Sequence, residues 1–258
     1  MPTWNAEQYL KFGDERTQPC RDLVARVNLD SPRRIIDLGC GPGNSTAVVA
    51  RRWPEADITG LDSSAEMIDA ARLQQPARHW IVGDIEQWSR KDGESFDLVF
   101  SNAALQWVSE HDEILPRLLG RVSSGGALAF QIPGNYDGPA HRLMRELAAS
   151  SAWRTWFPEG SIREWFSQEF PFYYDVLAPN CARLDLWLTD YIHILPNAQA
   201  IVEWYKGTGL RPFLDLLPEE KRASFMADYL ELIRTAFPPQ PDSKVLFPFR
   251  RLFAIAYR

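Results

Sequence analysis

The segment RRIIDLGCGPGNS, residues 33–45, decides how this chain folds. Its apolar run predicts a short buried strand, after which Gly39, Gly41 and Gly43 alternate before a helical stretch begins at residue 44. Glycine lets the backbone turn tightly and lie against a ligand where any side chain would collide. A strand, a glycine-rich turn and a helix in this order predict a ligand site at the end of the strand.

The rest of the first half repeats the alternation of strand and helix. Further strands are expected at ADITGLD (56–62), HWIVGDI (79–85), FDLVFSN (96–102) and GGALAFQIP (125–133), with helices over 44–52, 64–72 and 110–122. This alternation specifies a parallel sheet with helices on both faces. Two long alternating stretches, 182–194 and 244–257, would complete the sheet as an antiparallel hairpin. The fold class is α/β: a Rossmann-like, seven-stranded, mostly parallel doubly wound sheet with an antiparallel last strand and a helical cap.

The same patterns divide the chain into four parts. Residues 1–30 are expected to form two helices that close over the site, and residues 31–134 the α/β core that binds the ligand. Residues 135–181 are expected to be a helical insertion, with helices over 138–150 and 162–178. Residues 182–258 would supply the last two strands, with a helical cap inserted at 197–237.

Composition narrows the partners of this protein. Hydrophobic residues make up 45% of the chain and charged residues 24%, as in ordinary globular proteins, and the net charge is −6. The Lys and Arg residues are scattered, so nucleic acid is not an expected partner. No apolar run reaches the ~18 residues that span a bilayer, and the N-terminal residues lack a signal-peptide pattern. We therefore expect a cytoplasmic protein without membrane contact.

The three cysteines do not suggest a disulfide framework or a metal site. Cys20, Cys40 and Cys181 are an odd number, have no CxxC spacing and lie far from any His-rich stretch. They are expected to be small buried apolar residues. We expect no bound metal, and we expect a monomer.

A carboxylate beside the glycines indicates the kind of ligand. A dinucleotide fingerprint is GxGxxG and holds a pyrophosphate, whereas this chain has GxGxG followed by Asn44 and preceded by Asp37. Asp37 would repel a pyrophosphate but suits a ligand that carries an ammonium group. This combination resembles the first motif of class I S-adenosylmethionine-dependent methyltransferases, and the resemblance implies S-adenosylmethionine as cofactor.

The other strand ends agree with that resemblance. Asp62 follows Gly41 by 21 residues, about where an acid binds the ribose hydroxyls in such folds. The resemblance implies that Asp84 and Ile85 hold the adenine, and Met67 would pack on its face. The fourth strand would border the methionine part and the transferring methyl. The full set of expected cofactor residues is Asp37, Gly39, Gly41, Asn44, Asp62, Ser63, Met67, Asp84, Ile85, Ser101, Asn102 and Ala103.

The methyl acceptor is indicated by a second resemblance. The stretches WNAEQYLKFGDERTQPCRDL (4–23), IIDLGCGPGNST (35–46), LDSSAEMI (61–68), FDLVFSNAALQWV (96–108) and FRRLFAIAY (249–257) resemble the trans-aconitate 2-methyltransferase family. That resemblance covers nearly the whole chain. It implies methyl transfer to a carboxylate of trans-aconitate, a small tricarboxylate, giving a monomethyl ester and S-adenosylhomocysteine. Spacing and composition alone specify only a small molecule.

A carboxylate acceptor needs positioning more than acid–base catalysis. Its pKa of ~4 leaves it ionised at neutral pH, so we expect no general base and no catalytic residue of that kind. Arginine suits the remaining carboxylates because its planar fork donates to both oxygens. The expected substrate-binding residues are Tyr9, Arg16, Gln106, Trp107, Arg163, Arg250 and Arg251, with Arg183 and Arg211 as second choices.

Four alternatives stay open. The first keeps the donor and methylates a carrier-protein-bound carboxylate such as malonyl, which would favour a basic docking patch. The second methylates a metabolite hydroxyl and would want a base near Asn102. A nicotinamide-dependent oxidoreductase uses a similar sheet, although Asp37 and the GxGxG spacing suit it poorly. The last is a non-catalytic module that only binds S-adenosylmethionine.

Overall fold

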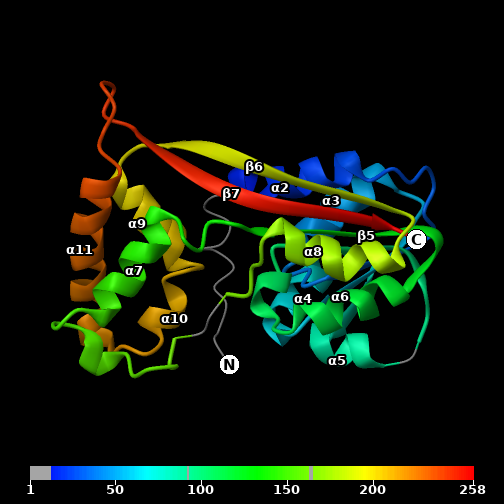
Figure 1. Ribbon diagram of the computed structural model, residues 1–258, viewed down its shortest axis with the longest axis horizontal. Coiled ribbons are helices and arrows are strands. Elements are labelled where there is room, and N and C mark those ends of the chain that lie inside the picture. The colour runs from blue at the N-terminus through cyan, green and yellow to red at the C-terminus, as the bar shows by residue number, and fades with distance from the viewer. Residues whose placement is uncertain (1–12, 92, 163–164) are drawn as a thin grey trace. The chain divides into compact units, whose positions relative to one another are not determined.

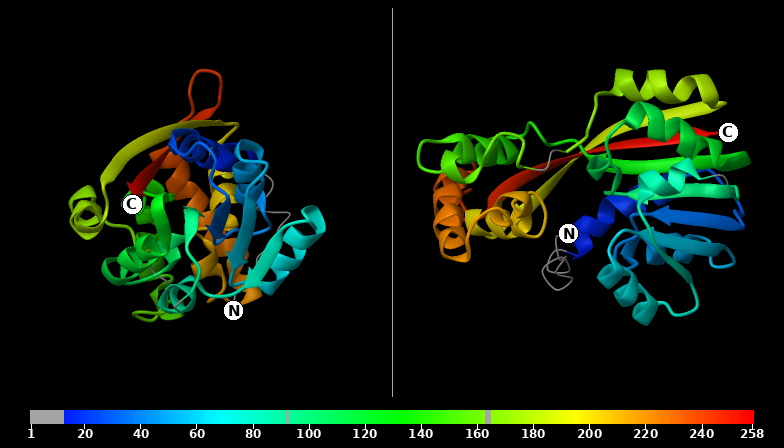
Figure 2. Two further views of the ribbon diagram at one scale, coloured as in Figure 1. Left: turned by 90° about the vertical axis from the view of Figure 1, so that its right-hand side faces the viewer. Right: turned by 90° about the horizontal axis from the view of Figure 1, so that it is seen from below.

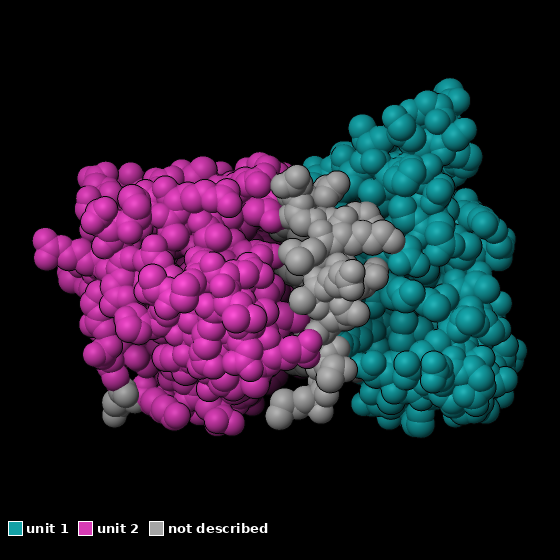
Figure 3. Space-filling model, turned by 180° about the vertical axis from the view of Figure 1, so that it is seen from behind, with its two compact units in different colours: residues 1–12, 134–164, 190–250 teal, residues 13–133, 165–189, 251–258 magenta. Residues whose placement is uncertain are grey.

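A computed structural model describes residues 13–91, 93–162 and 165–258, with the side chains of residues 13–16 left out (Figure 1). The chain forms two compact units (Figure 3). The larger unit comprises residues 13–133, 165–189 and 251–258, and the smaller comprises residues 1–12, 134–164 and 190–250. We call them the sheet unit and the helical unit.

Seven strands of the described chain form one sheet in the order β3-β2-β1-β4-β5-β7-β6. Their bounds are β1 Arg34–Leu38, β2 Asp57–Asp62, β3 His79–Val82, β4 Phe96–Asn102, β5 Val122–Pro133, β6 Arg183–Leu195 and β7 Val245–Tyr257. The first five pair in parallel. The chain therefore winds outward from β1 in one direction to β3 and in the other to β5, so its topology reverses at the boundary between β1 and β4. Ligands of open α/β sheets bind beyond the carboxyl ends of the strands at such a boundary.

Strand β7 pairs antiparallel with β5, from Ala127 opposite Tyr257 to Pro133 opposite Arg251. Strand β6 follows β7 at the edge of the sheet. The N–H of Ala182 donates to the carbonyl of Tyr257 at 2.8 Å, so the start of β6 lies beside the end of β7. The predicted fold class, including the antiparallel end of the sheet, is confirmed.

Helices lie on both sides of the sheet in the sheet unit (Figures 1 and 2). They are α2 Gly13–Arg26, α3 Asn44–Arg52, α4 Ala65–Gln74, α5 Ile85–Arg90, α6 His111–Gly120 and α8 Phe170–Leu177, with short 3₁₀ helices η1 Leu105–Trp107 and η3 Ala178–Asn180. Strand side chains alternate between the faces. One face packs on α6 and α8 through a fully buried apolar cluster that includes Val99, Leu118 and Phe130.

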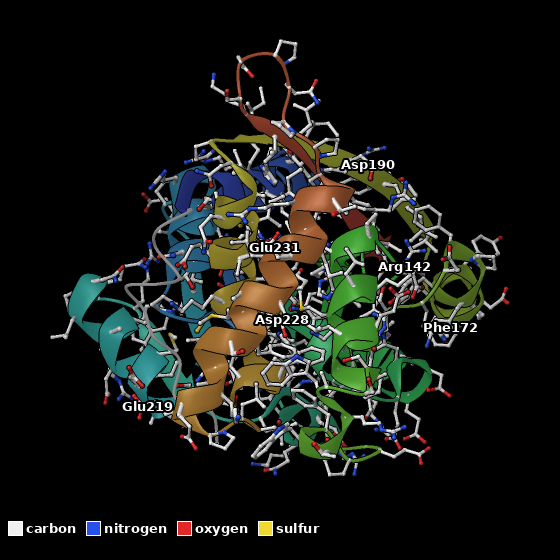
Figure 4. The ribbon with its side chains drawn as sticks, turned by 90° about the vertical axis from the view of Figure 1, so that its left-hand side faces the viewer. Arg142, Phe172, Asp190, Glu219, Asp228 and Glu231 are labelled. Carbon is white, nitrogen blue, oxygen red and sulfur yellow. The ribbon has the colours of Figure 1, made fainter. Side chains whose placement is uncertain are left out.

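The helices of the helical unit are α7 Pro139–Ala149, α9 Ala198–Lys206, α10 Arg211–Leu214 and α11 Glu219–Ala236, with the 3₁₀ helix η2 Arg154–Trp156. Asp228 and Glu231 lie on α11, and Arg142 on α7 (Figure 4). Much of the aromatic content of the second half of the chain fills this core, where Trp153 and Phe225 meet edge to face at 5.0 Å. The indole of Trp153 donates to Asp228 at 2.8 Å, which satisfies its buried N–H.

One expected helix is wrong in its first half. Residues 165–169 are not helical, and α8 begins only at Phe170, with Pro171 in its first turn. The N–H of Phe166 donates to the carbonyl of Gln106 at 2.8 Å, a contact outside any helix, and proline is well placed at a helix start. Among the described helices none combines the length and apolarity that a bilayer crossing requires.

Candidate active site

The glycine loop is fixed against the end of β2. The N–H groups of Gly39 and Cys40 both donate to the carbonyl of Leu61, at 2.7 and 3.1 Å. Gly39, Gly41 and Gly43 have φ of 72°, 55° and 92°, in the left-handed region that favours glycine. The loop therefore needs glycine at these positions for its backbone path.

The three glycines differ in what a side chain would meet. A Cβ on Gly39 would lie 2.1 Å from the Cβ of Ala104, and one on Gly43 would lie 2.8 Å from Nε2 of Gln75. A Cβ on Gly41 would meet no described atom within 4 Å. Gly39 and Gly43 therefore permit close packing within the protein, while Gly41 faces space that the described atoms leave open.

Asp37 on β1 is fully buried. Its Oδ2 accepts from the hydroxyls of Ser45 and Thr46, at 2.6 and 2.7 Å, in the first turn of α3. Its Oδ1 is buried and accepts no hydrogen bond from the described residues. Burial raises the pKa of Asp37 to about 6, against the two hydroxyl bonds, which lower it. A buried carboxylate with one unpaired oxygen is an unfinished interaction that a cationic group would complete.

Asp62, at the end of β2, ties the loop to the next helix. Its Oδ2 accepts from the N–H of Gly41 and its Oδ1 from the N–H of Ser64, both at 2.9 Å. Burial raises the pKa of Asp62, whereas these backbone bonds lower it. Each carboxylate oxygen has a second lone pair, so Asp62 keeps capacity for hydroxyl donors.

The neighbours of Asp62 divide between surface and core. Ser63 is exposed, and Met67 is buried in α4 with its N–H bonded to the Ser64 hydroxyl at 3.3 Å. Asn44 is half-buried at the first position of α3.

The end of β3 places the expected adenine residues at the start of α5. Asp84 is exposed and caps this helix, accepting from the N–H of Gln87 at 3.0 Å. Ile85 is buried in the apolar cluster, 3.7 Å from the Cβ position of Gly39. Capping occupies one lone pair of Asp84 and leaves its other oxygen open for a second donor.

The end of β4 is held by polar contacts to its neighbours. The hydroxyl of Ser101 donates to the carbonyl of Leu38 at 2.9 Å, joining β4 to β1. Ala103, with φ of 55°, donates its N–H to the carbonyl of Gln131 at 2.9 Å. Asn102 is half-buried, and its Oδ1 accepts from Nε2 of Gln131 at 2.7 Å.

The expected acceptor residues fall into three groups. Tyr9 and Arg163 lie outside the described residues, and Arg16 lies in α2 with its side chain undescribed. Gln106 and Trp107 belong to η1 in the sheet unit. Gln106 is buried and donates to the carbonyl of Ala103 at 2.7 Å.

Trp107 lies in the sheet unit, whereas the consecutive residues Arg250 and Arg251 of β7 belong to different units and make different contacts. The Trp107 ring packs edge to face on Trp165 at 5.4 Å. Arg250 is exposed in the helical unit and binds both oxygens of Asp190, at 2.9 and 3.0 Å. Asp190 is labelled in Figure 4. Arg251 is buried in the sheet unit, where its guanidinium donates to Oε1 of Gln131 at 3.4 Å. Consecutive strand residues point to opposite faces, which separates these two side chains.

Sequence reasoning missed Ser45, Thr46 and Gln131. The two hydroxyl residues follow Gly43 after one intervening residue, and a hydroxyl pair in the first turn of a helix could have been matched to a buried acid in the preceding strand. Gln131 is the polar residue within the apolar run ALAFQIP, and a polar residue in a buried strand could have been proposed as part of the site. No cluster of three or more His, Cys, Asp or Glu residues in the described chain is arranged to hold a metal.

Comparison with known proteins agrees with this geometry. A family described as a methyltransferase domain matches residues 35–126. The trans-aconitate 2-methyltransferase of Rhodopseudomonas palustris (strain BisB18) is 48% identical over 258 residues, covering 100% of both chains, and that of Azoarcus sp. (strain BH72) is 47% identical with the same coverage. The fold is shared with Haemonchus contortus phosphoethanolamine N-methyltransferase 2, solved with S-adenosyl-L-methionine, at a TM-score of 0.54 and 17% identity, over 92% of this chain and 52% of that one. The chain belongs to the trans-aconitate 2-methyltransferase family of S-adenosylmethionine-dependent methyltransferases.

Proposed function

We propose that this protein transfers the methyl group of S-adenosylmethionine to a carboxylate of trans-aconitate, giving a monomethyl ester and S-adenosylhomocysteine. The observation that carries this proposal is the 48% identity to a trans-aconitate 2-methyltransferase along the whole length of both chains. Identity of that extent includes the N-terminal and C-terminal parts, where the sequence carries its less generic resemblance to the family.

The loop after β1 suits the donor. Gly41 opens on free space with its backbone in the left-handed region, so a ligand can approach the main chain there. The unpaired Oδ1 of Asp37 suits the ammonium group of the donor's amino-acid part, and the spare lone pairs of Asp62 suit the ribose hydroxyls. The remaining residues proposed on the donor side are Gly39, Asn44, Ser63, Met67, Asp84, Ile85, Ser101, Asn102 and Ala103.

The proposed reaction requires the protein mainly to position the acceptor carboxylate. When bound, S-adenosylmethionine would supply a methyl group on a sulfonium; a carboxylate oxygen would attack the methyl carbon and S-adenosylhomocysteine would leave, so that the C–S bond breaks as the C–O bond forms. No proton moves, because the nucleophile is already an anion. The protein's residues must strip water from that anion and aim it.

Arginine is the proposed anchor for the acceptor's other carboxylates. Arg251 is buried on the sheet beside Gln131, whereas Arg250 is exposed and binds Asp190. We therefore place Arg251 first among the described cations and keep Arg16, Arg163 and Arg250 as further candidates. Gln106, Trp107 and Tyr9 stay proposed neighbours of the acceptor.

The test is methyl transfer from labelled S-adenosylmethionine to a panel of acceptors. Trans-aconitate should be methylated in preference to cis-aconitate, citrate and malonyl carrier protein, and the product should be a base-labile monomethyl ester. Label that appears only on another acceptor would refute the substrate assignment and leave the donor site standing. Failure of S-adenosylhomocysteine to bind in calorimetry would refute the donor site as well.

A further inference from the structure

Gln131 is a fully buried polar side chain near the end of β5. It lies directly opposite Asn102 in the pairing of β4 with β5, so the two side chains share a face of the sheet. Pro133, two residues further along β5, lies opposite Arg251 of β7 and puts Arg251 on the same face. An arginine, a glutamine and an asparagine therefore form a row across three adjacent strands of the sheet unit.

The contacts in this row have a fixed direction. Arg251 donates to Oε1 of Gln131 at 3.4 Å, and Nε2 of Gln131 donates to Oδ1 of Asn102 at 2.7 Å. A guanidinium has donors and no acceptor, so only the oxygen of Gln131 can face it. The amide nitrogen of Gln131 must then face Asn102, and only the oxygen of Asn102 can accept from it.

The consequence is that Asn102 presents its N–H donors beyond the row. Its oxygen is engaged by Gln131, so its Nδ2 is the group left to meet a ligand at the end of β4. An amine nucleophile needs an acceptor oxygen at its N–H groups, whereas a carboxylate needs donors. An N–H donor at this position suits a carboxylate acceptor better than an amine.

We propose that Gln131 is a positioning residue that, with Arg251, holds Asn102 with its amide N–H toward the acceptor, so that Asn102 binds the reacting carboxylate. This inference rests on the proposed function, because it assigns Asn102 to the acceptor of that reaction. It adds Gln131 to the site and gives Asn102 a hydrogen-bond direction.

The test is a double-mutant cycle between the two amides. Gln131→Glu keeps an oxygen for Arg251 but cannot donate to Asn102, whose amide then turns round and presents its carbonyl. We expect Gln131→Glu to lower kcat/KM for trans-aconitate roughly 10- to 100-fold, as for loss of a hydrogen bond to a charged group. We expect Asn102→Ala to cost a similar factor, and the double variant Gln131→Glu/Asn102→Ala to be no worse than the worse single variant.

The controls separate positioning from folding. The Kd of S-adenosylhomocysteine by calorimetry should stay within about threefold of wild type in Gln131→Glu, since Gln131 is not a residue proposed on the donor side and the variant keeps Asn102. Gln74→Glu makes the same substitution at an exposed position of α4 and should leave kcat/KM unchanged. If Gln131→Glu does not fold, Gln131→Met removes both hydrogen bonds without burying a charge and enters the same cycle.

Two results would overturn the inference alone. Losses that multiply in the double variant would show that Gln131 does not act through Asn102, and full activity of Gln131→Glu would show that the direction of the amide is irrelevant. Wild-type protein that methylates no carboxylate acceptor would instead overturn the proposed function, and this role of Asn102 with it.

Discussion

Replacing Asp37 by asparagine should stabilise the folded protein and weaken donor binding at the same time. Asp37 is fully buried, and burial raises its pKa from the ordinary value of 3.8 to about 6. The folded state therefore binds a proton more tightly than the unfolded state does. Between pH 3.8 and about 6 the unfolded chain holds fewer protons at Asp37, so the stability contributed by this group falls as pH rises through that window and is lowest above it.

The size of the effect follows from the two pKa values. Their difference, at 1.36 kcal/mol for each pKa unit, gives an upper value of about 3 kcal/mol for the cost of the buried charge at pH 7. Asp37→Asn keeps the shape of the side chain and removes the charge. The variant should therefore unfold with a free energy up to about 3 kcal/mol larger than wild type at pH 7, and about equal to it below pH 3.8.

Urea unfolding of both proteins from pH 3.5 to 7.5 isolates the contribution of Asp37, because the contributions of other titrating groups cancel in the difference between the two free energies of unfolding. Calorimetry then tests the functional half of the reasoning. An ammonium group beside Asp37 would lower its pKa, so S-adenosylhomocysteine should release protons on binding near pH 6 to the wild type and not to Asp37→Asn. The reasoning is refuted if the variant is less stable than wild type at pH 7, or if it binds the product equally well.

Three further predictions concern the loop, the ribose carboxylate and the arginines. Asp62→Ala should weaken S-adenosylmethionine binding by about 1–3 kcal/mol in calorimetry, because it removes the acceptor of two N–H groups and of the proposed ribose hydroxyls. Unchanged affinity would show that Asp62 is not part of the site. Gly43→Ala should lower the free energy of unfolding by about 1–3 kcal/mol in thermal unfolding, because its Cβ would meet Gln75. A Cβ on Gly41 meets no described atom, so Gly41→Ala should reduce stability less than Gly43→Ala and weaken donor binding more. Arg251→Gln should raise the KM for trans-aconitate far more than the KM for S-adenosylmethionine. Arg250→Gln loses an exposed ion pair worth about 0–1 kcal/mol and should change the KM for trans-aconitate less. Equal effects of the two variants would show that burial on the sheet does not decide which arginine binds the acceptor.

Most of the fold could be predicted from the sequence because each strand of the core ends in a turn that local patterns reveal. The strand before Gly39 pairs in parallel, as expected, with the strands that end at Asp62 and Asn102. The helix expected over 162–178 shows the limit. Its apolar spacing is helical, but Phe166 donates its N–H to Gln106, about 60 residues earlier in the chain, and no local pattern specifies that partner.

In the candidate site, too, contacts within one segment could be predicted from the sequence and contacts between distant segments could not. Residues next to the glycines, such as Asp37, could be proposed because the ligand contacts that a loop makes follow from its own sequence. The partners of Asn102 could not, because Gln131 is 29 residues away and Arg251 is 120 residues from Gln131. Which of two consecutive arginines joins them depends on the register of β7 against β5, and a shift of one residue would exchange the faces of both.

The sheet order sets the distance between the carboxylate proposed for the cationic donor and the guanidinium proposed for the anionic acceptor. Asp37 on β1 and Arg251 on β7 share a face, with β4 and β5 between their strands. Three strand spacings of about 4.8 Å separate them by roughly 14 Å across the sheet. At that separation the carboxylate and the guanidinium do not form an ion pair with each other. The amides of Asn102 and Gln131 lie between them, so the proposed function would place the cationic donor toward Asp37 and the anionic acceptor toward Arg251.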